Sequence, residues 1–151
     1  MKNKRILPGS IADVILAALY FSFMQGTWFQ GIWKENVWMA ATLVTFLAAA
    51  AISLWEIQIF QRKTASVRVF MSAYVPYLIR TAVIIILTVA LFLYVRENAA
   101  EIYSGGWINP PMFQWTALCW IAICALCSLV TFVTGAARTM LYHDDEKGKM
   151  R

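Results

Sequence analysis

Four long apolar segments follow one another along the chain, and each is about as long as a bilayer is thick. They run from Ile11 to Phe29, from Val37 to Phe60, from Tyr74 to Val95 and from Gln114 to Thr134. A helix needs about 20 mostly apolar residues to cross a hydrocarbon core of about 30 Å, and it satisfies its own backbone hydrogen bonds. The pattern predicts an all-α, polytopic membrane protein with four transmembrane helices in a single domain over residues 1–151.

The overall composition agrees with a membrane protein. Hydrophobic residues make up 61% of the chain and charged residues 14%. A soluble chain of 151 residues could not bury that much apolar surface. The net charge of +5 could indicate a nucleic-acid partner, but the basic residues are spread over three segments beside the spans. We therefore expect them to attract membrane lipids, and we expect no nucleic-acid partner.

Lysine and arginine are distributed unevenly between the two sides of the predicted bundle. One side carries Lys2, Lys4, Arg5, Arg62, Lys63, Arg68, Arg138, Lys147, Lys149 and Arg151. The loops on the opposite side carry only Lys34 and Arg96. Because basic residues near span ends resist translocation, both termini are predicted to be cytoplasmic. Size and short loops suggest a bacterial inner membrane.

Small side chains line one face of several predicted helices. In the second span this face contains Ala41, Thr45, Ala49 and Ser53, and in the fourth it contains Thr131 and Thr134. Small residues let helix backbones approach closely in lipid. These faces predict close helix packing, either within the chain or between copies. Because four helices use only part of their surface internally, we expect a homo-oligomer or a complex with another membrane subunit.

Three charged residues lie inside the predicted spans, at similar depth near the cytoplasmic side. They are Asp13, Glu56 and Arg80. An isolated charge at depth costs several kcal/mol, so such residues usually face inward and pair. Arg80 is expected to pair with Glu56, with Asp13 as the second choice of partner, since a carboxylate matches the guanidinium fork.

Two interpretations of this charge cluster remain open. In the first, Arg80 and Glu56 form a structural ion pair that orients two spans, and Asp13 stays hydrated near the interface. In the second, Glu56 or Asp13 is a titratable coupling site that responds to a proton, a substrate or a conformational change.

Catalytic and cofactor signals are weak. Cys124 and Cys127 have the C-x-x-C spacing used in thiol exchange, but Cys119 is the only other cysteine, so no second pair could pass electrons. We expect these cysteines to act as small packing residues, with a membrane thiol oxidoreductase as a distant alternative. The single His143 excludes paired axial haem ligation within the chain. No cofactor and no metal site are predicted.

The sequence therefore leaves two classes of function open. The first is a non-catalytic membrane subunit, a scaffold or sensor, that oligomerises and docks a cytoplasmic or membrane partner. Docking would use the basic middle loop, with Arg62, Lys63 and Arg68, together with the charged tail. The second is an oligomeric small transporter or channel that uses the cluster of Asp13, Glu56 and Arg80.

Overall fold

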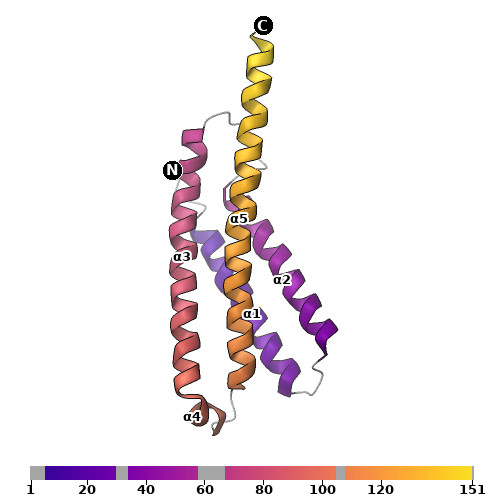
Figure 1. Ribbon diagram of the computed structural model, residues 1–151, viewed down its shortest axis with the longest axis vertical. Coiled ribbons are helices and arrows are strands. Elements are labelled where there is room, and N and C mark those ends of the chain that lie inside the picture. The colour runs from indigo at the N-terminus through magenta and orange to yellow at the C-terminus, as the bar shows by residue number, and fades with distance from the viewer. Residues whose placement is uncertain (1–5, 30–33, 58–66, 105–107, 151) are drawn as a thin grey trace.

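The computed structural model describes residues 6–29, 34–57, 67–104 and 108–150. These residues form α1 (Ile6–Phe29), α2 (Glu35–Glu56), α3 (Val67–Glu97), α4 (Ala99–Ser104) and α5 (Pro110–Lys149) (Figure 1). Within these ranges there is no β-strand. The expected all-α class is confirmed.

Four of the helices are long and apolar enough to cross a membrane. The qualifying stretches are Pro8–Gly26, Glu35–Glu56, Phe70–Glu97 and Pro110–Leu141. Each of them overlaps one of the four spans expected from the sequence. The chain is therefore compatible with a multi-pass membrane protein.

The helix ends differ from the ends of the apolar segments. Helix α3 begins at Val67, before the expected start at Tyr74, and α5 continues far past Thr134 to Lys149. Helix α5 also begins early, at Pro110, since proline is well suited to a first helical turn. Apolar runs mark the part of a helix that can lie in lipid, whereas the helix itself continues through polar residues.

Helix α5 occupies the centre of the bundle. It packs on α1, α2 and α3, and α1 and α2 also pack on each other. Helix α3 packs chiefly along α5, with few close backbone approaches to α1 or α2. In Figure 1, α3 and α5 run side by side, and α1 and α2 are inclined to them.

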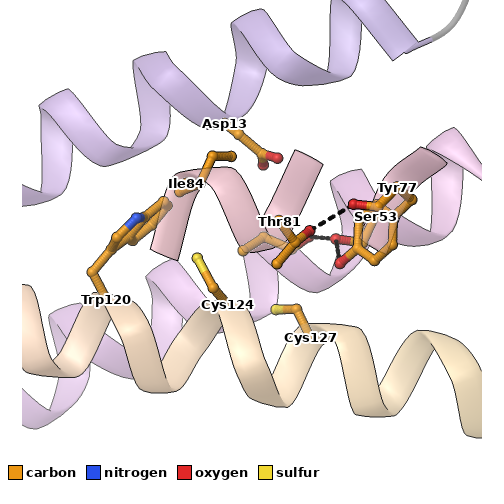
Figure 2. A pocket seen from close by; sticks show the side chains of 9 residues that line it. Asp13, Ser53, Tyr77, Thr81, Ile84, Trp120, Cys124 and Cys127 are labelled. Carbon is orange, nitrogen blue, oxygen red and sulfur yellow. Dashed lines mark hydrogen bonds between the residues drawn. The ribbon is translucent and has the colours of Figure 1, made fainter. Parts of the chain in front are cut away.

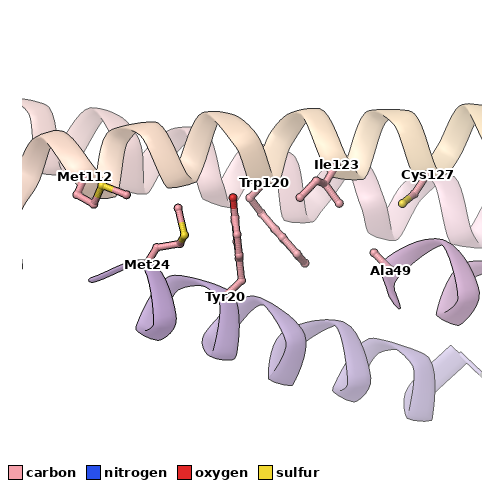
Figure 3. Close-up of a cluster of buried hydrophobic side chains, with 7 residues drawn as sticks. All are labelled: Tyr20, Met24, Ala49, Met112, Trp120, Ile123 and Cys127. Carbon is pink, nitrogen blue, oxygen red and sulfur yellow. The ribbon is translucent and has the colours of Figure 1, made fainter. Parts of the chain in front are cut away.

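The main core lies between α5 and the first two helices. It consists of Tyr20, Met24, Ala49, Met112, Trp120, Ile123 and Cys127 (Figure 3). The hydroxyl of Tyr20 forms a 2.9 Å hydrogen bond with that of Thr42, which ties α1 to α2. In lipid, such packing and polar contacts hold helices together, since burying apolar groups against one another gives no hydrophobic gain.

The faces of small residues are used inside this chain. Thr45, Ala49 and Ser53 of α2 and Thr131 of α5 are buried, while Ala41 and Thr134 are partly buried. The hydroxyls of Thr45, Ser53 and Thr131 donate to carbonyls one turn earlier in their own helices. These residues were expected to serve packing within or between copies, and the packing within the chain covers them. The expectation of a homo-oligomer, or of a complex with another membrane subunit, stays a prediction.

Gly135 of α5 allows the first turns of α3 to approach α5 closely. A side chain at Gly135 would overlap the ring of Phe70. That ring stacks on Tyr74 at 5.5 Å between centroids, and the Tyr74 hydroxyl donates to the backbone oxygen of Ser128 at 3.2 Å. The aromatic side chains of α3 therefore fix its position along α5.

Candidate functional site

The charged cluster joins three helices. Arg80 of α3 donates from Nη2 to Oδ2 of Asp13 on α1 at 2.7 Å. From Nη1 it donates to Oε1 of Glu56, at the end of α2. The structure thus contains the expected ion pair with Glu56 and adds a second one with Asp13. Arg80 therefore links α3 to α1 and α2, and the side chains of Leu54 and Ile57 at the end of α2 also pack on the aromatic residues of α3.

The three side chains are largely shielded. Their exposed fractions are 12% for Asp13, 4% for Glu56 and 13% for Arg80. Asp13, which one interpretation placed in a hydrated position near the interface, is thus largely covered by its neighbours. Its position on the inner face of α1, one turn after Ser10, directs it toward Arg80 rather than outward.

The first turns of α1 contact both Arg80 and Glu56. Ser10 accepts a further hydrogen bond from Nη1 of Arg80 at 3.2 Å. The carboxylate of Glu56 lies where a side chain at position 9 would be, so Gly9 is required for this approach. A glycine and a serine, three or four residues before an aspartate, therefore form the α1 part of the site.

Tyr77 supports the guanidinium of Arg80 from one turn earlier in α3. The guanidinium carbon lies 5.3 Å from the centre of the Tyr77 ring, within the range of a cation–π contact. The Tyr77 hydroxyl donates to Oγ of Ser53 at 2.9 Å. Within the described part of the chain, Nε of Arg80 is buried without a hydrogen-bond partner. Both terminal nitrogens of the guanidinium, Nη1 and Nη2, therefore donate hydrogen bonds, whereas Nε does not.

A small cavity adjoins the charged cluster at the centre of the bundle. Its volume is about 20 Å³, enough for about one water molecule. It is lined by Asp13, Ala49, Ser53, Tyr77, Thr81, Ile84, Trp120, Cys124 and Cys127, from all four long helices. In Figure 2, Asp13 projects from α1, and Cys124 and Cys127 come from α5. Glu56 and Arg80 do not line the cavity, so Asp13 is the member of the ionic cluster that touches it.

The three cysteines are free thiols. Cys127 is buried, and Cys119 and Cys124 are partly buried among the helices. No group of three His, Cys, Asp or Glu side chains in the described ranges could hold a metal ion.

The end of α5 forms a second candidate site. Every described side chain from Met140 to Met150 is exposed. Helix α5 extends beyond the other helices there (Figure 1). We call residues 140–149 the distal segment. The sequence suggested only a charged tail at this point, and the helical continuation was not expected.

The basic middle loop lies mostly outside the described residues. Arg62 and Lys63 belong to that undescribed part, and Arg68 is exposed in the first turn of α3. Sequence reasoning missed Gly9, Ser10 and Tyr77 as parts of the charged site. Their spacing of three or four residues from Asp13 and Arg80 places them on the same helix faces, and this signal could have identified them.

No family model matches the sequence, and neither a curated protein nor a solved structure matches it.

Proposed function

We propose that the protein is a non-catalytic membrane subunit that docks a soluble cytoplasmic protein through the distal segment of α5. The observation that carries this proposal is the continuation of α5, as one helix with exposed side chains, beyond its contacts with the rest of the bundle. A four-helix membrane anchor with a projecting helix fits a scaffold or sensor.

The length of α5 supports this assignment. At about 1.5 Å per residue, its 40 residues extend roughly 60 Å, about twice the thickness of a hydrocarbon core. The packing of Phe70 against Gly135 marks the region where α3 still covers α5. Beyond Leu141, where the apolar stretch ends, the helix carries mainly charged and polar residues.

The charge pattern of the distal segment favours a helix. Asp144 and Lys147 are three residues apart, on neighbouring positions of one helix face. Lys147 and Lys149 lie in the last turn, where positive charge complements the helix dipole. Since the segment continues an existing helix, it does not need a new nucleus.

The same charges indicate a protein partner rather than a lipid surface. Anionic lipid attracts clusters of basic residues. The distal segment instead carries both signs of charge, with three acidic residues from Asp144 to Glu146 followed by two lysines. The partner we propose has a surface of mixed charge that receives one exposed helix. The unequal distribution of lysine and arginine supports the cytoplasm as its compartment.

Site-specific photo-crosslinking in native membranes tests this proposal. A photoreactive phenylalanine derivative replaces Lys147 in the distal segment or, as a control, the exposed Tyr103 of α4 at the other end of the bundle. We expect one discrete protein adduct from position 147 that is absent from position 103, and the same partner should be lost after truncation at Leu141. Lipid adducts alone at position 147, or the same adducts at both positions, would contradict docking through this segment.

The alternative function is an oligomeric small transporter. The buried cluster of Asp13, Glu56 and Arg80 favours it, because charges at such depth often mark ion pathways. The adjoining cavity accommodates only about one water, so a solute path would need several copies of the chain. Substrate-dependent flux into vesicles that contain the purified protein, lost on Arg80→Ala, would favour this alternative.

A further inference from the structure

The charged cluster contains more negative than positive groups. Asp13 and Glu56 both bind Arg80, so two carboxylates share one guanidinium. With all three ionised, the triad holds a net charge of −1 inside a lipid-embedded bundle. A buried charge without compensation costs several kcal/mol, and neutralisation by a proton is the usual way in which proteins avoid that cost.

The groups that face Asp13 do not supply the missing positive charge. Arg80 of α3 binds Asp13 directly, and around Arg80 lie Ser10 of α1, Glu56 of α2 and Tyr77 of α3, of which Tyr77 also lines the cavity with Asp13. Across the cavity, α5 contributes the thiols of Cys124 and Cys127. Within the described helices, the cation bonded to these carboxylates is Arg80.

The two carboxylates differ in their access to a proton. Glu56 is more deeply shielded and does not line the cavity. Asp13 is less shielded and lines the cavity that has room for about one water. Of the two carboxylates that bind Arg80, Asp13 is therefore the one beside a space that could hold water.

We propose that the triad of Asp13, Arg80 and Glu56 is a proton-binding site, and that Asp13 holds the single exchangeable proton. A hydronium ion transfers the proton to the Asp13 carboxylate and leaves as water, so one O–H bond breaks, another forms, and no electron is transferred. Arg80 remains bonded to both carboxyl groups, and the triad becomes neutral. This site goes beyond the docking function proposed above.

A proton fits this site better than a metal cation. Sodium would need several oxygen ligands, and the cavity has room for only about one water. The Ser53 hydroxyl already donates to the Ala49 carbonyl and accepts from Tyr77, and the Thr81 hydroxyl donates to the Tyr77 carbonyl. The positive guanidinium of Arg80 also binds the Asp13 carboxylate that such a cation would need.

Isotope-edited infrared spectroscopy on the wild-type protein in lipid vesicles tests the proposal. A protonated carboxyl group has a carbonyl stretch that is separate from the carboxylate bands. We expect one such group per chain, lost as the pH is raised, and shifted by carbon-13 labelling of aspartate side chains but not of glutamate side chains. Three outcomes would overturn the proposal: absence of the band throughout the pH range in which the circular dichroism is unchanged, a shift on glutamate labelling, or loss of the band in sodium but not in N-methylglucamine buffer.

Two variants separate the charge balance from burial as the cause. In Glu56→Gln, the remaining pair of Asp13 and Arg80 is neutral, so we expect the protonated-carboxyl band to disappear although Asp13 is still present. The control Glu35→Gln, at an exposed position in the first turn of α2, should retain the band. A band of unchanged intensity in Glu56→Gln would show that the proton does not depend on the excess of negative charge, and the proposal would fail.

Discussion

Contact between α1 and α2 at the charged site depends on the missing side chain of Gly9. The Glu56 carboxylate occupies the volume that a methyl group at position 9 would need. Moving Glu56 aside would also disturb its ion pair with Arg80. A single glycine therefore couples helix packing to charge neutralisation.

We expect Gly9→Ala to destabilise the protein by about 1–3 kcal/mol, the usual cost of overpacking in a tight interior. Gly26→Ala is the matched control, because a side chain there would meet no atom within 4 Å. The control should be neutral, or more stable by about 0.5–1 kcal/mol from the better helix propensity of alanine. Unfolding in mixed micelles measures both. Equal stabilities of the two variants would show that Glu56 can move away from position 9 without loss.

Arg80 and Glu56 should show an asymmetric double-mutant cycle. Arg80→Ala leaves two buried carboxylates together and should cost about 3–5 kcal/mol. Glu56→Ala leaves the neutral pair of Asp13 and Arg80 and should cost less. In the double variant the repulsion between the carboxylates is gone, so its loss should be smaller than the sum of the single losses by about 0.5–3 kcal/mol. Unfolding free energies that add would show that these side chains do not interact.

At the scale of the helix, α2 has two faces with different roles. Ala49 is buried against the other helices, whereas Ala51 is exposed on the surface of the bundle. We expect Ala49→Leu to destabilise the fold by about 1–3 kcal/mol through overpacking. Ala51→Leu, the same substitution on the outer face, should leave the free energy of unfolding unchanged. Weakened self-association without loss of stability in Ala49→Leu would instead place this face between copies of the chain.

Part of this architecture could be predicted from the sequence. The positions of the spans follow from apolar length, and the inner face of α2 follows from the spacing of its small residues. The helical distal segment of α5 was missed, because the expected span ended at Thr134 and its apolar stretch ends at Leu141, whereas the helix itself continues through polar residues to Lys149. The burial of Asp13 was also missed. Its position along its own helix gives its depth in the membrane, but it does not show which side chains of other helices surround the carboxylate. The position of α3 along α5 depends on aromatic contacts between distant segments, which have no local signal.

At the scale of the whole molecule, the orientation in the membrane is a prediction from the distribution of lysine and arginine. In a variant whose three cysteines are replaced by alanine, a cysteine at Ser104 of α4 should react with an impermeant thiol reagent in intact cells. A cysteine at Ser66, which lies outside the described residues, should react only after the membrane is permeabilised. The reverse pattern would invert the topology and exclude a cytoplasmic position for the distal segment.

The charged triad also has a consequence for the order in which the protein is made. Its members lie on α1, α2 and α3, whereas α5, the main packing partner of α3, is synthesised last. When Arg80 enters the bilayer, both of its carboxylate partners have therefore already been synthesised. During biogenesis, these ionic contacts can hold α3 next to the first two helices before α5 is present, together with the packing of its aromatic side chains on Leu54 and Ile57 at the end of α2.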